Sequence, residues 1–439
     1  FLLDTTNTKA MEMMFSLLAF KGDTLAAEKV LSEIYTRNPN EENFKIFTDF
    51  LSNTNPLKAI EIFEKSLREN YNEETKISLA MLYFQLSDTA KSLEILYEVV
   101  QNNPSDANNY DFIKIASKFS RFDYLKKFMT EIYPKLEIER KENVFLYYSE
   151  ELAKFKKELT ENKEFIRKVL NDFKELKTNN VFAFFNSAQL GYKIQDTNLT
   201  IYYSRKALDE VDTFFVVPLL ISNYLFNVGA RDEAFQVLNR FREKFPEQLD
   251  YPFQIALLNF LDKKYEIARK YAEEVLHFNP EYIDAITMIA DSYDKEGRFK
   301  DAEEYYIKAL QINPDSPVVN NNFAYFLSKF DDKLNDAEEM SLKAINAEPN
   351  NASFIDTYGW ILYRKGNLEE ARKFLEKALE LMDNDNYELY EHLALLYFKM
   401  GKGKEAIENM KKALDLDPNN EKLKEEYQEI ENSLNLKNK

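Results

Sequence analysis

Apolar side chains recur along most of this chain at the spacing of amphipathic helices. In residues 283–316 one helical face is formed by side chains that return every three or four positions: Ile286, Ile289, Ala290 and Tyr293. Gly297 supplies a residue suited to the left-handed conformation that ends a helix. Asp301 then opens a second helix with an acid in its first turn, and Pro314 stops it. The pattern predicts a helical hairpin.

The hairpin pattern repeats along the chain with a period of 34 or 35 residues. One series of alanines shows this spacing: Ala234, Ala268, Ala302, Ala337, Ala371 and Ala406. Prolines mark the ends of the periods: Pro246, Pro280, Pro314, Pro349 and Pro418. A period of this length is typical of stacked helical repeats, in which each unit buries its apolar face against its neighbours.

The stretch FIDTYGWILYRKGNLEEARKFLEKALE at 354–380 explains why small residues recur among bulky ones. Two helices cross closely only where one offers a small side chain opposite a large one. We expect Gly359 and Ala371 to make room within a hairpin, and Ala378 to make room for the next hairpin.

These residues resemble the tetratricopeptide repeat family, whose small residues at repeat positions 8, 20 and 27 and proline at position 32 recur here. The resemblance divides the second part of the chain into the repeats 181–214, 215–248, 249–282, 283–316, 317–351, 352–386 and 387–420. It extends upstream through 8–41, 42–72 and 73–106. Between 107 and 180 the pattern of small residues is absent, because Lys114, Lys126 and Tyr133 occupy the positions where small residues are expected.

The resemblance implies an all-α, right-handed superhelical solenoid of about twelve stacked hairpins. We predict repeats similar to the family in 1–106, degenerate repeats or a joint in 107–180, and regular repeats in 181–420. Residues 421–439 are predicted to form a polar C-terminal capping helix and tail, which such an array needs at its end.

Composition restricts the function as well as the fold. The chain has no cysteine, which excludes disulfides and thiolate chemistry. Its net charge is −18, of which residues 181–439 carry about −14, so it repels phosphate backbones and nucleic acid is not an expected partner. The longest apolar run, FFVVPLLI at 214–221, is too short to span a membrane. The chain begins at Phe1, and we expect any targeting segment to lie upstream.

No arrangement of residues indicates catalysis, a metal or a cofactor. The two histidines, His277 and His392, have no Cys or second His nearby in sequence. The segment DLDPNNEKLKEE at 415–426 resembles a calcium loop, but Asn420 replaces the glycine that the loop requires. Established hydrolase and phosphate-loop motifs are missing. We therefore expect a protein that is not an enzyme.

In the tetratricopeptide family the first helix of each repeat lines a concave groove that binds extended peptides. Mapping its binding positions onto this chain predicts these candidate binding residues: Asn186, Tyr192, Asn223, Gln254, Asn321, Asn322, Tyr325, Asp356, Trp360, Tyr363, Arg364, His392, Phe398 and Lys399. Packing within the hairpins is the competing interpretation for the aromatic members. The Lys–Asn set with which co-chaperone members hold a terminal carboxylate cannot be placed on consecutive first helices here.

The stretch 321–366 is similar to paired repeats of bacterial envelope tetratricopeptide proteins, many of them lipoproteins, through Asn-Phe-Ala-Tyr and Asp-Thr-Tyr-Gly-Trp. This similarity suggests a periplasmic or outer-membrane-associated protein. The leading hypothesis is a protein–protein interaction scaffold that binds a peptide or partner helix in assembly of an envelope complex. Two alternatives remain: a regulatory or substrate-recruiting module of an enzyme whose catalytic domain lies outside this chain, and an RNA-binding helical repeat. The oligomeric state stays open.

Overall fold

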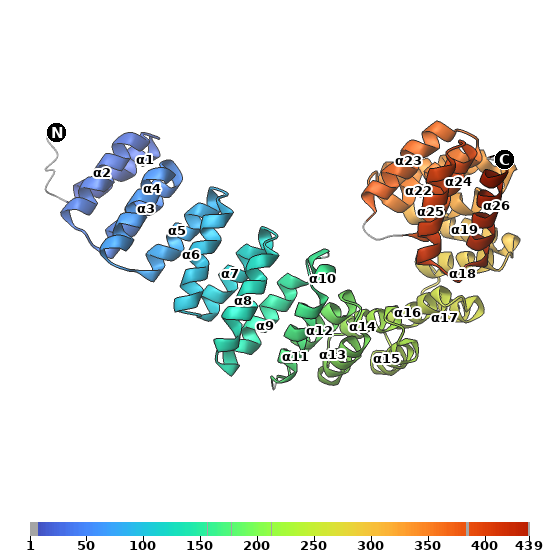
Figure 1. Ribbon diagram of the computed structural model, residues 1–439, viewed down its shortest axis with the longest axis horizontal. Helices are drawn as coiled ribbons and strands as arrows, with labels where there is room; N and C mark the ends of the chain where they lie inside the picture. The colour runs from blue at the N-terminus through green and yellow to red at the C-terminus, as the bar shows by residue number, and fades with distance from the viewer. Residues whose placement is uncertain (1–7, 156, 177, 212, 383–385, 438–439) are drawn as a thin grey trace. The chain divides into compact units, whose positions relative to one another are not determined.

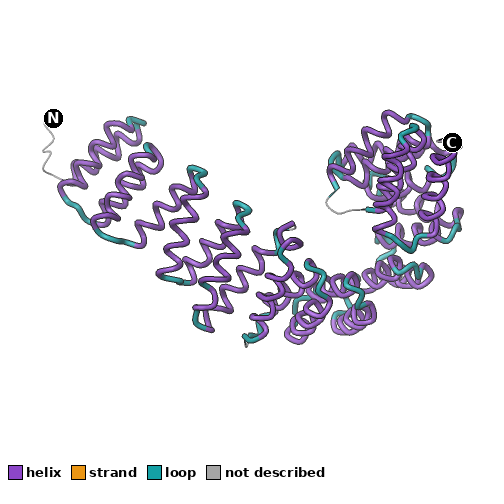
Figure 2. Tube along the Cα trace, viewed as in Figure 1, coloured by secondary structure: helices purple, strands orange, loops and turns teal. Residues whose placement is uncertain are grey.

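The computed structural model describes residues 8–155, 157–176, 178–211, 213–382 and 386–437, and within these ranges it contains helices and no strand (Figure 1; Figure 2). The chain divides into two compact units, Phe1–Ala234 (unit 1) and Phe235–Lys439 (unit 2), with the division inside α15. The predicted all-α stack of hairpins is confirmed. The predicted segment boundaries at 106, 180 and 420 stay predictions. Residues 1–7 and 438–439, in the first and last predicted segments, lie outside the described residues.

Unit 1 is a stack of helical hairpins, and the first helices of these hairpins are α1, α3, α5, α7, α9, α12 and α14. Its helices are α1 (Thr8–Phe20), α2 (Thr24–Arg37), α3 (Glu41–Thr54), α4 (Pro56–Glu69), α5 (Glu73–Gln85), α6 (Thr89–Asn102), α7 (Asp106–Lys118), α8 (Phe122–Glu131), η1 (Tyr133–Lys135), α9 (Ile138–Leu152), α10 (Lys157–Glu161), α11 (Lys163–Lys174), α12 (Val181–Lys193), α13 (Thr197–Glu210) and α14 (Val216–Asn227). The short α10 precedes α11, the partner of α9.

Unit 2 continues the same alternation and ends on a single helix. Its helices are the larger part of α15 (Arg231–Lys244), α16 (Asp250–Leu261), α17 (Tyr265–Phe278), α18 (Ile283–Lys295), α19 (Phe299–Ile312), α20 (Pro317–Leu327), η2 (Asp331–Lys333), α21 (Leu334–Ala347), α22 (Ala352–Arg364), α23 (Leu368–Leu381), α24 (Tyr387–Lys399), α25 (Gly403–Leu416) and α26 (Glu421–Lys437). Separate apolar clusters fill successive layers, so each layer has its own small core.

A residue with positive φ separates the two helices of most hairpins. In the described chain these residues are Gly22, Ser87, Ser120, Gln195, Gly229, Lys263, Gly297, Gly366 and Gly401. This left-handed residue ends the first helix within one turn, and glycine adopts it without the cost of a Cβ. Polar caps then start many of the helices; Asp88, for example, accepts a hydrogen bond from the Lys91 amide.

Gly359 shows how closely the two helices of a hairpin approach. A Cβ placed on Gly359 of α22 would lie 2.8 Å from Cγ of Leu375 on α23. Ala371 and Ala378 are fully buried, and they share a core with Leu389 and Leu393 of the next hairpin. The predicted role of the small residues is therefore confirmed for this layer.

The register of the α7–α8 hairpin corrects the sequence interpretation of Lys114. The turn residue Ser120 lies 33 residues after Ser87, so this repeat begins one residue earlier than the 34-residue period predicts. Lys114 is consequently exposed, and the close-packing sites hold buried large residues: Ile113, Leu125 and Ile132. Bulky side chains at a helix crossing hold the helices apart, and α7 and α8 pack less closely than the helices of the regular hairpins.

The last helix, α26, covers the apolar side of the final hairpin. Leu423 and Ile430 are buried against a cluster that includes Tyr390, Ala394 and Met410. The outer face of α26 is rich in charged residues, including Glu421, Glu425 and Glu429. The predicted capping helix is thus present.

Candidate functional site

The first helices of unit 2 (α16, α18, α20, α22 and α24) and α26 line one side of the stack, here called the first-helix face. An ion pair closes across this face: Nζ of Lys295 on α18 lies 3.7 Å from Oε1 of Glu388 on α24. Two first helices, α20 and α22, lie between α18 and α24 in sequence. The ion pair nevertheless brings the C-terminal end of α18 close to the N-terminal end of α24, so the first-helix face must curve inward. The first-helix face of unit 2 is therefore its concave side.

A ladder of rings crosses this concave side between α22 and α24. The imidazole of His392 stacks on the indole of Trp360, with ring centroids 4.2 Å apart and an interplanar angle of 17°. Tyr363 stacks on the same indole at 4.9 Å, and the ammonium of Lys399 lies 4.8 Å from the centre of the Tyr363 ring. The ring of Tyr325 on α20 lies 6.1 Å from that of His392. Five predicted site residues therefore form one continuous cluster.

His392 is held by a carboxylate of the preceding repeat. Its Nδ1 lies 2.8 Å from Oδ1 of Asp356, to which it donates a hydrogen bond, and both side chains are largely buried. Burial lowers the pKa of His392, but the charge and hydrogen bond of Asp356, helped by Glu391 and Glu388, outweigh it and raise the pKa above its usual 6.5. These contacts therefore make His392 easier to protonate than a free histidine.

A polar relay joins α18, α19 and α20 beside the ring ladder. The hydroxyl of Tyr306 donates to Oδ1 of Asp291, and Nδ2 of Asn322 donates to Oδ2 at 3.3 Å. Nδ2 of Asn321 in turn donates to Oδ1 of Asn322 at 3.3 Å. Burial raises the pKa of Asp291 to about 6, against the effect of the hydrogen bonds. The predicted residues Asn321 and Asn322 are thus oriented by Asp291, which is not among the predicted site residues.

Ion pairs between consecutive repeats engage several charged residues of the concave side. Lys329 lies 2.6 Å from Asp294, Arg364 lies 2.9 Å from Asp331, and Lys422 pairs with Glu391. Arg364 is therefore committed to a partner within the chain. Asp291 and Asp294 could have been found from the sequence, because they occupy positions 9 and 12 of the repeat 283–316. The predicted residues Tyr325 and Tyr363 occupy positions 9 and 12 of their own repeats.

The other predicted residues lie outside the ring ladder. Phe398 is half-buried and packs in the core beneath α26, and Gln254 is half-buried on α16. In unit 1, Nδ2 of Asn186 donates to Oγ of Ser149 at 3.3 Å, and Tyr192 stacks on Tyr224 with centroids 5.1 Å apart. Asn223 is half-buried on α14. Unit 1 thus has its own first-helix face.

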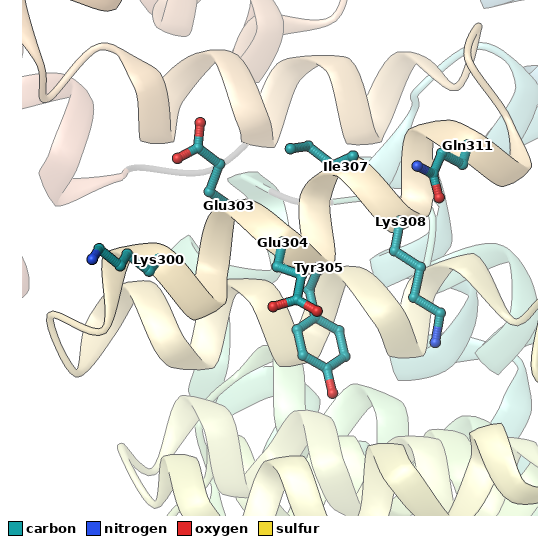
Figure 3. A pocket seen from close by; sticks show the side chains of 7 residues that line it. All are labelled: Lys300, Glu303, Glu304, Tyr305, Ile307, Lys308 and Gln311. Atoms are coloured by element: carbon teal, nitrogen blue, oxygen red, sulfur yellow. The ribbon is translucent and has the colours of Figure 1, made fainter.

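A surface cavity of about 720 Å³ lies on the opposite side of unit 2, along the second helix α19 (Figure 3). Its lining mixes charged and apolar side chains: Lys300, Glu303, Glu304, Tyr305, Ile307, Lys308 and Gln311. The charged groups do not converge on one point in Figure 3. Ile307 is 44% exposed, so this outer side presents some apolar surface of its own.

Within the described ranges, no three His, Asp or Glu side chains are grouped so that they could bind a metal ion. Among the helices described above, none combines the length and the apolar character that crossing a membrane requires.

Comparison with protein families matches the tetratricopeptide repeat at residues 283–316, 352–385 and 387–420. The predicted repeat register is confirmed there to within one residue. Curated relatives include the TPR repeat-containing protein MJ1428 of Methanocaldococcus jannaschii, 33% identical over 341 residues, which are 70% of this chain and 58% of that protein. The TPR repeat-containing protein PA4667 of Pseudomonas aeruginosa is 25% identical over 45% of this chain and 34% of its own length.

A third relative is the human protein O-mannosyl-transferase TMTC3, which is 27% identical over 36% of this chain and 19% of its own length. The chain thus spans less than two thirds of each of these curated relatives. Similar solved structures include the APC/C hetero-tetramer Cut9–Hcn1, with 14% identity, 97% of this chain and 90% of that chain covered and a TM-score of 0.45. Yeast Tom70 matches with 16% identity, coverage of 93% and 92% and a TM-score of 0.43.

Proposed function

Since this chain is a tetratricopeptide repeat protein, we propose that it is a non-catalytic scaffold that binds a peptide or partner helix on the concave first-helix face of unit 2. The observation that supports this proposal is the ring ladder, in which the half-buried side chains of Trp360 and Tyr363 are held in place by His392 and Lys399. Rigid aromatic side chains supply contact area to a partner at low entropic cost. In the competing interpretation these aromatic side chains only pack the hairpins together, and this face binds no partner.

The proposed setting is the assembly of a complex in the bacterial envelope, in the periplasm or at the outer membrane. This part of the proposal rests on the motif at 321–366, and on a relative that comes from a bacterium. The other two relatives come from an archaeon and from human, so they do not favour an envelope location.

The test is photo-crosslinking in cells from position 363, beside Trp360, with adducts identified by mass spectrometry. A photoreactive residue at position 307, on the exposed side of α19, serves as the outer-face control. We expect a discrete adduct from position 363 that Trp360→Ala removes and Phe299→Ala, a change of an exposed ring on α19, preserves. An adduct from position 307 but not from 363 would assign binding to the outer face.

A second candidate function is a recruiting or regulatory module of an enzyme whose catalytic domain lies outside this chain. The observation that favours it is the similarity to part of a protein named as a mannosyl-transferase. The complete natural reading frame distinguishes the two candidates, because a catalytic domain on the same polypeptide would support the module and contradict an independent scaffold.

A further inference from the structure

One segment of unit 1 differs in charge from the chain as a whole. Residues 107–180 contain 16 Lys and Arg against 13 Asp and Glu, in a chain whose net charge is −18. Among them, Lys114 and Lys118 are exposed and lie one helical turn apart on α7. The opposite side of α7 is buried through Phe112, Ile113 and Ala116. The register shift at Ser120 is what places Lys114 on the exposed side.

Both ammonium groups lie over aromatic rings of the same face. Nζ of Lys118 is 4.7 Å from the centre of the Phe84 ring on α5, and Nζ of Lys114 is 5.3 Å from that of Tyr110. Tyr147 on α9, 38% exposed, meets Tyr110 edge-on with centroids 4.7 Å apart. These contacts join three first helices into one surface, here called the lysine–aromatic strip: Phe84, Tyr110, Lys114, Lys118, Phe119 and Tyr147.

The lysines of the strip have no carboxylate partner in an ion pair among the described residues. Lys114 interacts electrostatically with Asp111, whose pKa is raised by burial and only partly lowered again by the Lys114 charge. On the concave side of unit 2, by contrast, Lys329, Arg364 and Lys422 all pair with carboxylates. The strip therefore carries two positive charges that form no ion pair among the described residues.

We propose that the lysine–aromatic strip binds an acidic segment of a partner protein that also carries apolar side chains. This inference rests on the proposed scaffold function and names the chemistry of one partner. Carboxylates of the segment pair with Lys114 and Lys118, and its apolar side chains contact Tyr110 and Tyr147. Charge complementarity favours the acidic segment, because the two lysines attract carboxylates although the chain as a whole is acidic. Two lysines supply too few positive charges for the extended phosphate contacts typical of nucleic acid.

The experiment measures binding of fluorescein-labelled peptides to the full chain by fluorescence anisotropy. The probe is a short peptide of Glu and Leu residues, and a second peptide carries Gln in place of every Glu. We expect the Glu peptide to bind at least about tenfold more tightly, a difference of about 1.4 kcal/mol. Raising the salt from about 50 mM to about 200 mM should weaken its binding several-fold.

The decisive variant is Lys114→Ala/Lys118→Ala, and its matched control is Lys168→Ala/Lys206→Ala, which removes two exposed lysines from α11 and α13. Binding of the Glu peptide should fall at least about tenfold in the first variant and change less than about twofold in the control. Equal losses in both variants, equal binding of the two peptides, or no binding of the Glu peptide would overturn the inference. Tighter binding of a single-stranded oligouridylate at the same lysines would assign the strip to RNA instead.

The outcome separates this inference from the scaffold proposal. If an adduct at position 363 persists when Lys114 and Lys118 are replaced, the scaffold proposal is supported independently of the result with the peptides. Peptide binding at the strip without any adduct in cells would contradict the concave-face proposal and keep the inference.

Discussion

His392 lies parallel to Trp360, with ring centroids 4.2 Å apart, while its Nδ1 donates to Asp356 at 2.8 Å. One side chain of α24 is thus fixed in both plane and direction by two side chains of α22. An aromatic surface held in this way needs little ordering when a partner arrives, which is the physical basis for placing the proposed binding site on this side of unit 2.

The Asp356–His392 pair should make the stability of unit 2 depend on pH. Because the folded-state pKa of His392 is raised above 6.5, its stabilising effect is complete below about pH 6.5 and is lost as the pH rises through the folded value. We expect Asp356→Asn to destabilise the protein by about 3 kcal/mol near pH 6 and by less near pH 9. Thermal unfolding followed by circular dichroism across this range provides the measurement.

The matched control for this prediction is His277→Asn, which removes an exposed histidine of α17 and leaves the pair intact. A loss of stability in Asp356→Asn that is the same at every pH would show that His392 is not charged in the folded protein.

Asp291 should produce a second pH effect at lower pH. Burial raises its pKa to about 6 from 3.8, so folding stability decreases as the pH rises from about 4 to about 6, where the unfolded chain releases the proton more readily. We expect Asp291→Asn to remove this decrease, which amounts to roughly 2 to 3 kcal/mol. Urea unfolding at several pH values measures it, and Asp284→Asn, at an exposed position of α18, is the control.

Gly359→Ala should destabilise the α22–α23 hairpin because its new Cβ would lie 2.8 Å from two atoms of the Leu375 side chain and 3.2 Å from the Leu375 backbone nitrogen. The expected cost is about 1–3 kcal/mol, since the neighbouring helix must move away. Ser353→Ala, at an exposed position of the same helix, should change stability by less than about 0.5 kcal/mol. Equal midpoints of chemical unfolding for the two variants would contradict the close approach of the helices.

Leu423→Ala should weaken the attachment of α26 to the final hairpin. The side chain is fully buried in the cluster that contains Ala394 and Met410, so its truncation leaves a cavity. We expect the free energy of unfolding to fall by about 2–4 kcal/mol. Gln428→Ala, on the exposed side of α26, is the control. Hydrogen exchange in α24–α26 should increase in the first variant alone, and unchanged exchange would show that α26 adds no stability.

Much of the fold follows from local sequence. The hairpins, their left-handed turns and the small residues at Gly359, Ala371 and Ala378 could be predicted because helices and their immediate neighbours are encoded within about 35 residues. The prediction that Lys114 occupies a close-packing site was wrong. The turn residues Ser87 and Ser120 are 33 residues apart instead of 34, and bulky residues stand where small ones were expected. Only the position of the turn at Ser120 therefore shows the register of this repeat.

The candidate site depends on more distant relationships. Family positions correctly selected Trp360, His392 and Asp356 as neighbours on one face, but not the stack and the hydrogen bond that join them. Contacts such as Lys295–Glu388, 93 residues apart in sequence, require a curvature that no single repeat encodes. The sequence by itself determined the repeating unit, because that unit is stabilised locally. Only the tertiary structure decided which charges are paired and which remain exposed, because small rotations between successive repeats accumulate along the stack.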